Sequence, residues 1–373
     1  MRYALTTEQE QFGQMIREFL TARAPESGLL ARIESGNRFD RQLWTDLCEQ
    51  LELPGLAVPE AHGGSGFGQI ELVVVLEELG RALTPVPYFA TAVMALPLIL
   101  AADTGQASSV ITDLASGASI GAAALAEPGT RAFDAPMTTA TPATHGHVLN
   151  GHKTLVIDGD LADIFVVSAE DDGQSALFIV EATADGVEVQ PHTMFDPTRG
   201  TADVRFDGAP ATRLGFGSAQ PAIDDVLDRA RIAMAAEQVG GTARCLDIAV
   251  EHAQTREQFG QAIGKFQSVK HQCARMLYDV ETARSAMWYA AWAAEDAPEE
   301  LADVVPVAKY LCSTAFQEAA RATVHILGGI GFTWEHPAHL FFKRATTSAQ
   351  FLGSAHESLY WLADQMLDGN QQQ

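Results

Sequence analysis

Residues 266–283 read FQSVKHQCARMLYDVETA, and this stretch decides the fold class of the last third of the chain. Its apolar side chains recur mostly at steps of three and four residues, which places them on one face of a helix. They are Phe266, Val269, Cys273, Met276, Leu277, Val280 and Ala283. A second long helix is predicted from Pro306 to Leu327. Because neither helix can bury its apolar stripe alone, the sequence predicts a bundle of helices over residues 219–373.

Upstream of this bundle, residues 118–218 have a different pattern. Short apolar runs separated by Gly, Asp and Asn predict a small β domain. The strand candidates are Val148–Leu149, Ile164–Val167 and Leu177–Val180. Asn150-Gly151 is a dipeptide typical of hairpins and predicts a turn.

Residues 1–117 again follow a helical period. Thr7 and Glu10 fit a capping box at the start of the first helix, and Asp40 is a candidate N-cap of a later one. A further helix is predicted from Ile70 to Leu83, after a glycine-rich loop. The chain is therefore expected to run from a helical domain through a β domain to a helical bundle.

Composition excludes several classes of partner. The chain has 373 residues, 47% of them hydrophobic, which is enough for two or three domains. With 48 acidic and 24 basic residues its net charge is −24, which argues against nucleic acid or an anionic membrane surface as a partner. The apolar run from Tyr88 to Ala102 is broken by Pro97 and is too short to span a bilayer, so a core helix is predicted there.

The cysteines indicate a reducing compartment. Cys48, Cys245, Cys273 and Cys312 are scattered through apolar helical patterns, without the close spacings of a disulfide framework. They are interpreted as reduced thiols, and the N-terminus shows no apolar signal segment, so a cytoplasmic protein is expected.

A metal site is weakly suggested and not predicted. His336 and His339 are three residues apart beside Glu335. No pattern supplies a third ligand, and Pro337 interrupts the helix face that would present both imidazoles.

Six segments together carry a resemblance to a known family. They are Val58–Gly64, Leu76–Gly80, Leu125–Gly129, Thr255–Gly260, Gly264–Gln267 and Leu327–Phe332. In this order over most of the chain, they resemble acyl-CoA dehydrogenases. The run Gly331–His336 resembles actinobacterial members, many of which act on steroid or other bulky acyl-CoA esters.

The resemblance implies an α+β fold with an N-terminal α-helical domain (1–117), a central β-barrel-like domain (118–218) and a C-terminal four-helix bundle (219–373). The bundle is expected to mediate a dimer of dimers. The implied reaction is α,β-dehydrogenation of an acyl-CoA thioester, with FAD as cofactor and an electron-transfer flavoprotein as electron acceptor.

The cofactor residues implied by the resemblance lie in two segments. Arg256, Gln258 and Phe259 match a stretch that reaches a neighbouring subunit's FAD, and Gln267 follows in the next matched segment. His325, Gly328 and Gly329 match the adenosine and pyrophosphate side, although the family usually has Gln at the position of His325. A forked Arg cation beside bare glycine backbone suits a pyrophosphate. The structural alternative is that Arg256 only ends a helix and Phe259 is core.

The catalytic base of the family is missing. The reaction needs a carboxylate to remove the α-proton. The resemblance places this carboxylate either at Leu352, just before Gly353, or at Ala230, just before Arg231. Neither side chain can accept a proton. Leu155 and Ile157 likewise stand where the family has the Trp and Thr that contact the flavin ring.

Three hypotheses follow from this combination. The first is a base-lacking subunit that completes the site of a second acyl-CoA dehydrogenase subunit, which supplies the base. The second is a self-sufficient enzyme with an unrecognised base, with Glu237 as the candidate because it lies in an apolar segment; the structural alternative pairs Glu237 with Arg231 or Arg244. The third is a non-catalytic scaffold that kept the fold.

Overall fold

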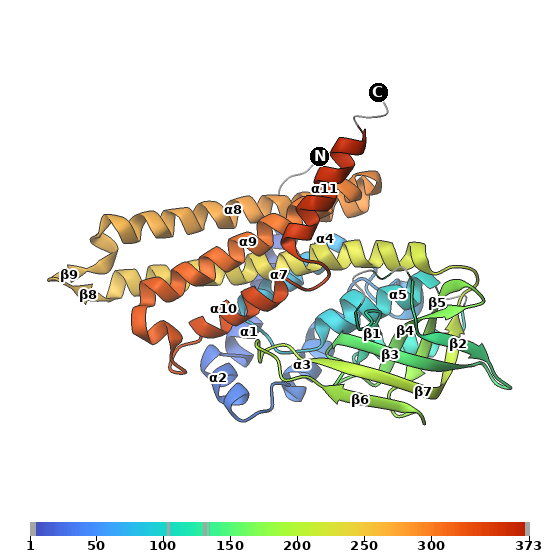
Figure 1. Ribbon diagram of the computed structural model, residues 1–373. Helices are drawn as coiled ribbons and strands as arrows, with labels where there is room; N and C mark the ends of the chain where they lie inside the picture. The colour runs from blue at the N-terminus through green and yellow to red at the C-terminus, as the bar shows by residue number, and fades with distance from the viewer. Residues whose placement is uncertain (1–4, 103–104, 130–132, 134, 370–373) are drawn as a thin grey trace. The chain divides into compact units, whose positions relative to one another are not determined.

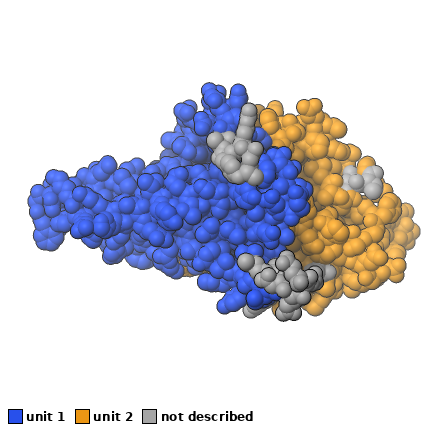
Figure 2. Space-filling model, turned by 90° about the horizontal axis from the view of Figure 1, so that it is seen from above, with its two compact units in different colours: residues 1–38, 69–84, 231–373 blue, residues 39–68, 85–230 orange. Residues whose placement is uncertain are grey.

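The computed structural model describes residues 5–102, 105–129, 133 and 135–369 (Figure 1). The chain forms two compact units, coloured separately in Figure 2. The first comprises residues 1–38, 69–84 and 231–373, and the second comprises residues 39–68 and 85–230. The first unit is mainly helical, and the second contains the large β-sheet.

The first unit combines N-terminal and C-terminal helices. These are α1 (Thr7–Arg23), α2 (Glu26–Glu34), α4 (Gln69–Arg81), α7 (Gln220–Thr255, from Arg231 onward), α8 (Gln267–Asp296), α9 (Leu301–Leu327), α10 (Ala338–Ser348) and α11 (Ala355–Gly369). The predicted capping box of the first helix is one residue too late. The Thr6 hydroxyl accepts from the Gln9 N–H at 3.3 Å, and the Gln9 side chain accepts from the Thr6 N–H at 2.9 Å. Thr6 to Gln9 has the same spacing as the predicted pair, so the sequence alone did not distinguish the two registers.

The predicted bundle helices are present. Met276, Val280 and Ala283 of the predicted stripe are buried in α8, whereas Leu277 is 51% exposed because it lies at the margin of the stripe. The second helix begins at Leu301, ahead of the predicted Pro306.

Two glycines let α4 and α7 cross with their backbones in contact. A Cβ atom on Gly80 would overlap the carbonyl oxygen of Glu237, and one on Gly240 would overlap the carbonyl oxygen of Glu77. Any larger residue would push the helices apart. This close crossing fixes the backbone of α7 around Glu237.

The second unit contains a closed sheet. Its strands are β1 (Gly121–Ala124), β2 (Thr139–Pro142), β3 (His147–Ile157), β4 (Ile164–Asp171), β5 (Gln174–Glu181), β6 (Val187–Pro191) and β7 (Thr201–Leu214). The strand order is β1-β4-β2-β3-β7-β5, β6 pairs with β7, and β5 pairs back with β4, which closes the path into a barrel. The three predicted strands correspond to β3, β4 and β5.

The predicted turn at Asn150-Gly151 is wrong. Both residues lie inside β3, next to a register shift against β7. A Cβ atom on Gly151 would overlap the Thr138 side chain, so this glycine permits a close approach of chain segments and not a reversal of direction.

The second unit also has a helical part, which contacts strand β1 through Thr91. Its elements are α3 (Arg41–Leu51), a π-helix (Phe89–Ala95), α5 (Leu96–Ala102) and α6 (Ser108–Ala115). Asp40 caps α3 as predicted, accepting from the Leu43 N–H at 3.0 Å. The apolar run is buried in the π-helix and α5, as predicted. Within the described ranges, no helix has both the length and the apolar character needed to cross a membrane.

Candidate functional site

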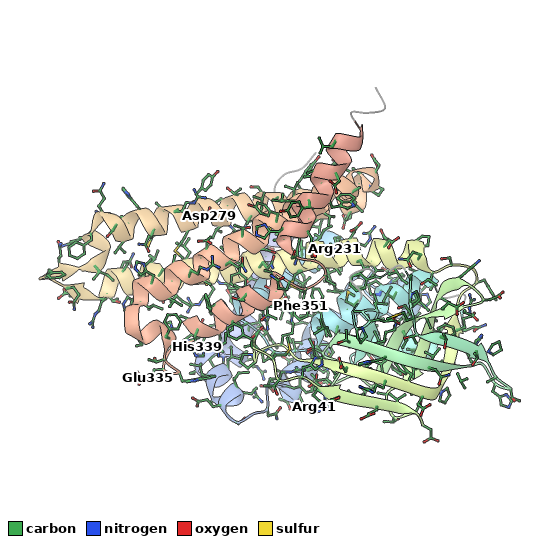
Figure 3. The ribbon with its side chains drawn as sticks, viewed as in Figure 1. Arg41, Arg231, Asp279, Glu335, His339 and Phe351 are labelled. Atoms are coloured by element: carbon green, nitrogen blue, oxygen red, sulfur yellow. The ribbon has the colours of Figure 1, made fainter. Side chains whose placement is uncertain are left out.

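The loop that carries Leu352 joins α10 to α11. Leu352 is half-buried and has a φ of +59°, a left-handed conformation that is uncommon for a residue with a Cβ atom. Its carbonyl oxygen accepts a hydrogen bond of 3.0 Å from Arg231 Nε, and the two segments lie close together in Figure 3. A backbone held in this conformation by surrounding contacts is typical of functional sites.

Lys309 holds the same loop from inside the helical unit. Its side chain is fully buried, and Nζ donates to the carbonyl oxygens of Ser348 at 3.0 Å and Phe351 at 2.8 Å. Burial, with the nearby Arg231 guanidinium, lowers the pKa of Lys309 to about 7. The loop is therefore held by two basic side chains, Arg231 and Lys309, and its Leu352 side chain is hydrocarbon. The sequence reasoning missed Lys309, although a lysine between Val305 and Cys312 on an apolar helix face was a usable signal.

The second position that the resemblance matches to a base is also hydrocarbon. Ala230 is completely buried in α7. The residue after it, Arg231, binds the Leu352 carbonyl group as described. Neither Ala230 nor Leu352 has an atom that could take up a substrate proton.

Glu237 lies in a buried ion pair. Its side chain is 9% exposed, and its Oε2 atom lies 4.0 Å from Nη1 of Arg344, which is equally buried. Arg344 is 107 positions away in the sequence, so helical spacing did not reveal it as a partner. Arg244 is bonded to Glu26 at 2.6 Å. Glu237 is therefore paired with a cation inside the helical unit.

The segment after α7 forms a short hairpin whose strands have two residues each, β8 (Glu257–Gln258) and β9 (Gln261–Ala262). Its tip consists of Phe259 and Gly260, with φ angles of +52° and +71°. Such turns favour Asn and Gly, so a phenylalanine here is unusual. Phe259 is 92% exposed, with its ring edge-to-face against Phe266 at 6.1 Å. Phe259 is therefore not a core residue.

The other cofactor candidates lie at the same end of the helical unit, where α7 and α9 end and α8 begins (Figure 1). His325 Nδ1 lies 3.3 Å from the Gln272 side chain of α8. Gly328 has a φ of +67°, and a Cβ atom on either Gly328 or Gly329 would meet nothing within 4 Å. All seven candidates are exposed, namely Arg256, Gln258, Phe259, Gln267, His325, Gly328 and Gly329.

This exposed end is far from the Leu352 loop of the same chain. Arg231, which binds the loop, lies in α7, and Arg256 directly follows the last residue of this helix, Thr255. Their 25-residue separation corresponds to about 37 Å along the helix. The structure thus gathers the seven cofactor candidates with one another and does not bring them to the base positions.

The β barrel has its own buried ion pair. Lys153 Nζ lies 2.6 Å from Oε1 of Glu127, which also accepts from the Thr138 N–H and hydroxyl. Burial lowers the pKa of Lys153 to about 8, against the opposing effect of Glu127. Beside Lys153, Leu155 is 49% exposed with a φ of +51°, and Ile157 is buried. These aliphatic side chains offer no hydrogen bond to a flavin.

The histidine considered for a metal site and the cysteines are packed among other side chains. His339 packs edge-to-face on Trp334 at 4.6 Å, and burial lowers the pKa of His339 to about 4. Among the described residues, no group of three or more His, Cys, Asp or Glu side chains is arranged to hold a metal ion. The four cysteines are free thiols, and three of them are buried.

Comparisons with known proteins agree on one family. Residues 6–118, 122–209 and 220–366 match the N-terminal, middle and C-terminal domains of acyl-CoA dehydrogenase, respectively. The chain is 33% identical to the acyl-CoA dehydrogenase IpdE2 of Mycobacterium tuberculosis over 354 residues, covering 94% of this chain and 95% of the relative.

Two solved structures are similar over nearly their whole length. One is the ChsE4–ChsE5 complex from Mycobacterium tuberculosis, with a TM-score of 0.90, 28% identity and coverage of 98% of this chain and 99% of that one. The other is the G363A variant of the Tcur3481–Tcur3483 steroid ACAD, with a TM-score of 0.88, 32% identity and the same coverage.

Proposed function

Because the chain belongs to the acyl-CoA dehydrogenase family, we propose that it is the base-lacking subunit of a heteromeric dehydrogenase. As an acyl-CoA dehydrogenase it is an oxidoreductase that acts on a CH–CH bond. The family's cofactor, FAD, accepts the β-hydride when bound. In the proposed assembly a second acyl-CoA dehydrogenase chain supplies the carboxylate base, and an electron-transfer flavoprotein accepts the electrons.

The observation that carries this proposal is the hydrocarbon at both positions matched to the family's base, Ala230 in α7 and Leu352 in a loop that is otherwise firmly held. Arg231 and Lys309 bind three carbonyl oxygens of the segment Ser348–Leu352. The loop has therefore kept a defined conformation, while the Leu352 side chain cannot remove a proton.

The exposed hairpin supports a contact with another chain's cofactor. A phenylalanine in a left-handed conformation and almost fully exposed is unfavourable in an isolated subunit. Phe259, the neighbouring Arg256 and the open backbone at Gly328 and Gly329 suit a flavin nucleotide: an aromatic face, a forked cation and accessible amide groups. At about 37 Å along α7 from the anchor of Leu352, they are too far away to serve the same flavin ring.

The similar structures support the choice of partner and substrate. The ChsE4–ChsE5 and Tcur3481–Tcur3483 structures each contain two different chains, and the second is described as a steroid ACAD, an acyl-CoA dehydrogenase. We therefore propose a heterotetramer as the assembly and a steroid side-chain CoA ester as the substrate.

Co-expression with a neighbouring gene for a second acyl-CoA dehydrogenase chain tests the proposal. The chain purified alone should show little flavin absorbance and no turnover, and the co-purified complex should be yellow and active. Within the complex, Phe259→Ala should release flavin, whereas Phe216→Ala, which removes another exposed phenylalanine, should not. A yellow, active homo-oligomer from single-chain expression would contradict the assignment. A stable complex without flavin would instead favour a scaffold.

The self-sufficient alternative depends on Glu237. Its buried position beside Arg344 favours a structural role for Glu237 in an ion pair. Turnover of the complex should therefore survive Glu237→Gln, provided that the variant folds. Loss of turnover with unchanged thermal stability would assign the base to Glu237.

A further inference from the structure

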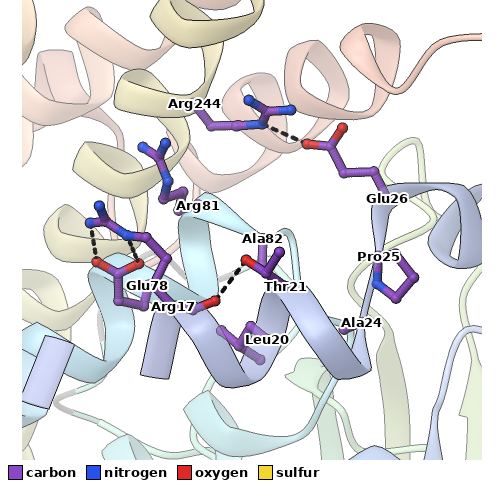
Figure 4. Close-up of a pocket in the computed structure, with 10 residues that line it drawn as sticks. All are labelled: Arg17, Leu20, Thr21, Ala24, Pro25, Glu26, Glu78, Arg81, Ala82 and Arg244. Carbon is purple, nitrogen blue, oxygen red and sulfur yellow. Dashed lines mark hydrogen bonds and ion pairs between the residues drawn. The ribbon is translucent and has the colours of Figure 1, made fainter. Parts of the chain in front are cut away.

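A cavity of about 370 Å³ lies in the helical unit, between α1, α2, α4 and α7 (Figure 4). This volume is within the usual range of small-molecule sites. Three arginines line it: Arg17 from α1, Arg81 from α4 and Arg244 from α7. Leu20 and Pro25 contribute apolar surface. The cavity thus combines several guanidinium groups with a hydrocarbon wall.

Each arginine is fixed in place by a carboxylate. Arg17 makes two bonds to Glu78, through Nε at 2.8 Å and Nη2 at 2.6 Å. Arg244 Nε donates to Glu26 at 2.6 Å, and Arg81 Nη2 donates to Asp247. The guanidinium groups are therefore held in defined positions before any ligand arrives, which lowers the entropic cost of binding.

These pairs leave donors unused. A guanidinium has five N–H donors. Within the described part of the chain, Arg81 makes no hydrogen bond through Nε or Nη1, Arg17 makes none through Nη1, and Arg244 makes none through Nη2. A ligand that accepts several hydrogen bonds can use these donors without breaking the existing ion pairs.

The cavity is separate from the positions assigned to the dehydrogenase reaction. Arg244 lies on α7, 13 residues after Arg231 and 12 residues before Arg256, which directly follows the helix. These separations correspond to about 20 Å and 18 Å along the helix axis. The cavity therefore lies apart from both the Leu352 loop and the exposed hairpin.

We propose that this cavity binds a small organic oxyanion, a carboxylate or a phosphate ester with a short hydrocarbon group. Both headgroups accept several hydrogen bonds from guanidinium groups, often in pairs. The wall around Leu20 and Pro25 contacts the hydrocarbon part. Arg244 Nη1 also lies 3.6 Å from Oε1 of Glu251, so the three arginines are paired with four carboxylates. Binding therefore relies on directed hydrogen bonds and not on a long-range positive field.

Calorimetric titration of the full-length chain with hexanoate and, separately, with inorganic phosphate tests the proposal. A Kd in or below the low-millimolar range, about 1 mM, is expected for one or both probes. Hexanoate binding alone identifies a carboxylate site, and phosphate binding alone identifies a phosphate site.

Arg81→Lys is the decisive variant. A lysine keeps the charge beside Asp247 but loses the forked donors, so binding should weaken by about tenfold or more. Arg321→Gln serves as the matched control, because Arg321 is an exposed arginine paired with Glu318 on α9, and binding should change less than about twofold. Circular dichroism checks that both variants fold. No binding of either probe at about 10 mM, or equal binding by a folded Arg81→Lys variant, would overturn the proposal.

Discussion

Replacing Lys309 by Met should change how stability depends on pH. Lys309 is fully buried, and its pKa is lowered from 10.5 to about 7 by burial and by the nearby Arg231 cation. Between these two values, the unfolded chain binds a proton at this lysine that the folded chain does not. The free energy of unfolding therefore rises with pH in this window and falls as the pH drops toward 7.

The size of the effect follows from the shift. A difference of about 3.5 pKa units corresponds to about 5 kcal/mol over the whole window. From pH 7 to pH 9, the Lys309 contribution should rise by about 2 kcal/mol, because the lysine is still half protonated in the folded state at pH 7. A methionine does not titrate, so the stability of Lys309→Met relative to the wild type should fall by this amount.

Urea denaturation at pH 7, 8 and 9 measures the difference, and urea leaves the ionic strength unchanged. The other titrating groups contribute equally to the wild type and the variant. The quantity to follow is therefore the difference in free energy of unfolding between the two proteins, and how it changes with pH. Lys270→Met, at an exposed lysine of α8, should follow the wild type at every pH. If the free energy of unfolding changes with pH in the same way in the wild type and in Lys309→Met, the lowered pKa of Lys309 is refuted.

Three further predictions concern buried groups. Gly240→Ala should destabilise the protein by about 1–3 kcal/mol or more by overpacking the α4–α7 crossing, whereas Gly329→Ala, in open space, should change the melting temperature little; equal shifts would contradict the crossing. The pKa of His339 is lowered to about 4, so the wild type should lose up to about 3 kcal/mol of stability as the pH falls from 6.5 to 4. Thermal melts of His339→Leu over the same pH range should show a smaller loss. An unchanged pH profile in this variant would exclude His339 as the source. In urea denaturation, Lys153→Met should lower the free energy of unfolding by about 3–5 kcal/mol, because it leaves the Glu127 carboxylate buried without its cation. Adding Glu127→Gln should recover part of this loss. No recovery would show that the carboxylate is not the cause.

The sequence predicted those features that depend on local pattern. The α8 stripe, the Asp40 cap and the strands β3, β4 and β5 were all identified from periodicity or capping chemistry. Errors arose where two local interpretations were equally good, as with the register of the first capping box. They also arose where a distant segment decided the outcome, as with Gly151, which packs against Thr138.

The candidate site was predictable only in part. The order of motifs matches the family's base to Leu352 and Ala230, neither of which is a carboxylate, and this match stays a prediction. The partner of Glu237 was not readable, because Arg344 is brought beside it only by the packing of α10 against the rest of the helical unit.

The sequence by itself determined the order of helical and β segments and the family resemblance, because these depend on residue type and spacing along the chain. It also predicted hydrocarbon at the two positions that the resemblance matches to the base. Only the tertiary structure decided that Lys309 and Arg231 hold the loop of Leu352, and that the cofactor candidates gather at one exposed end of the helices. It also created the arginine-lined cavity. The physical reason is that burial, hydrogen-bond partners and exposure depend on segments far apart in the chain, whose contacts form only when the helices pack.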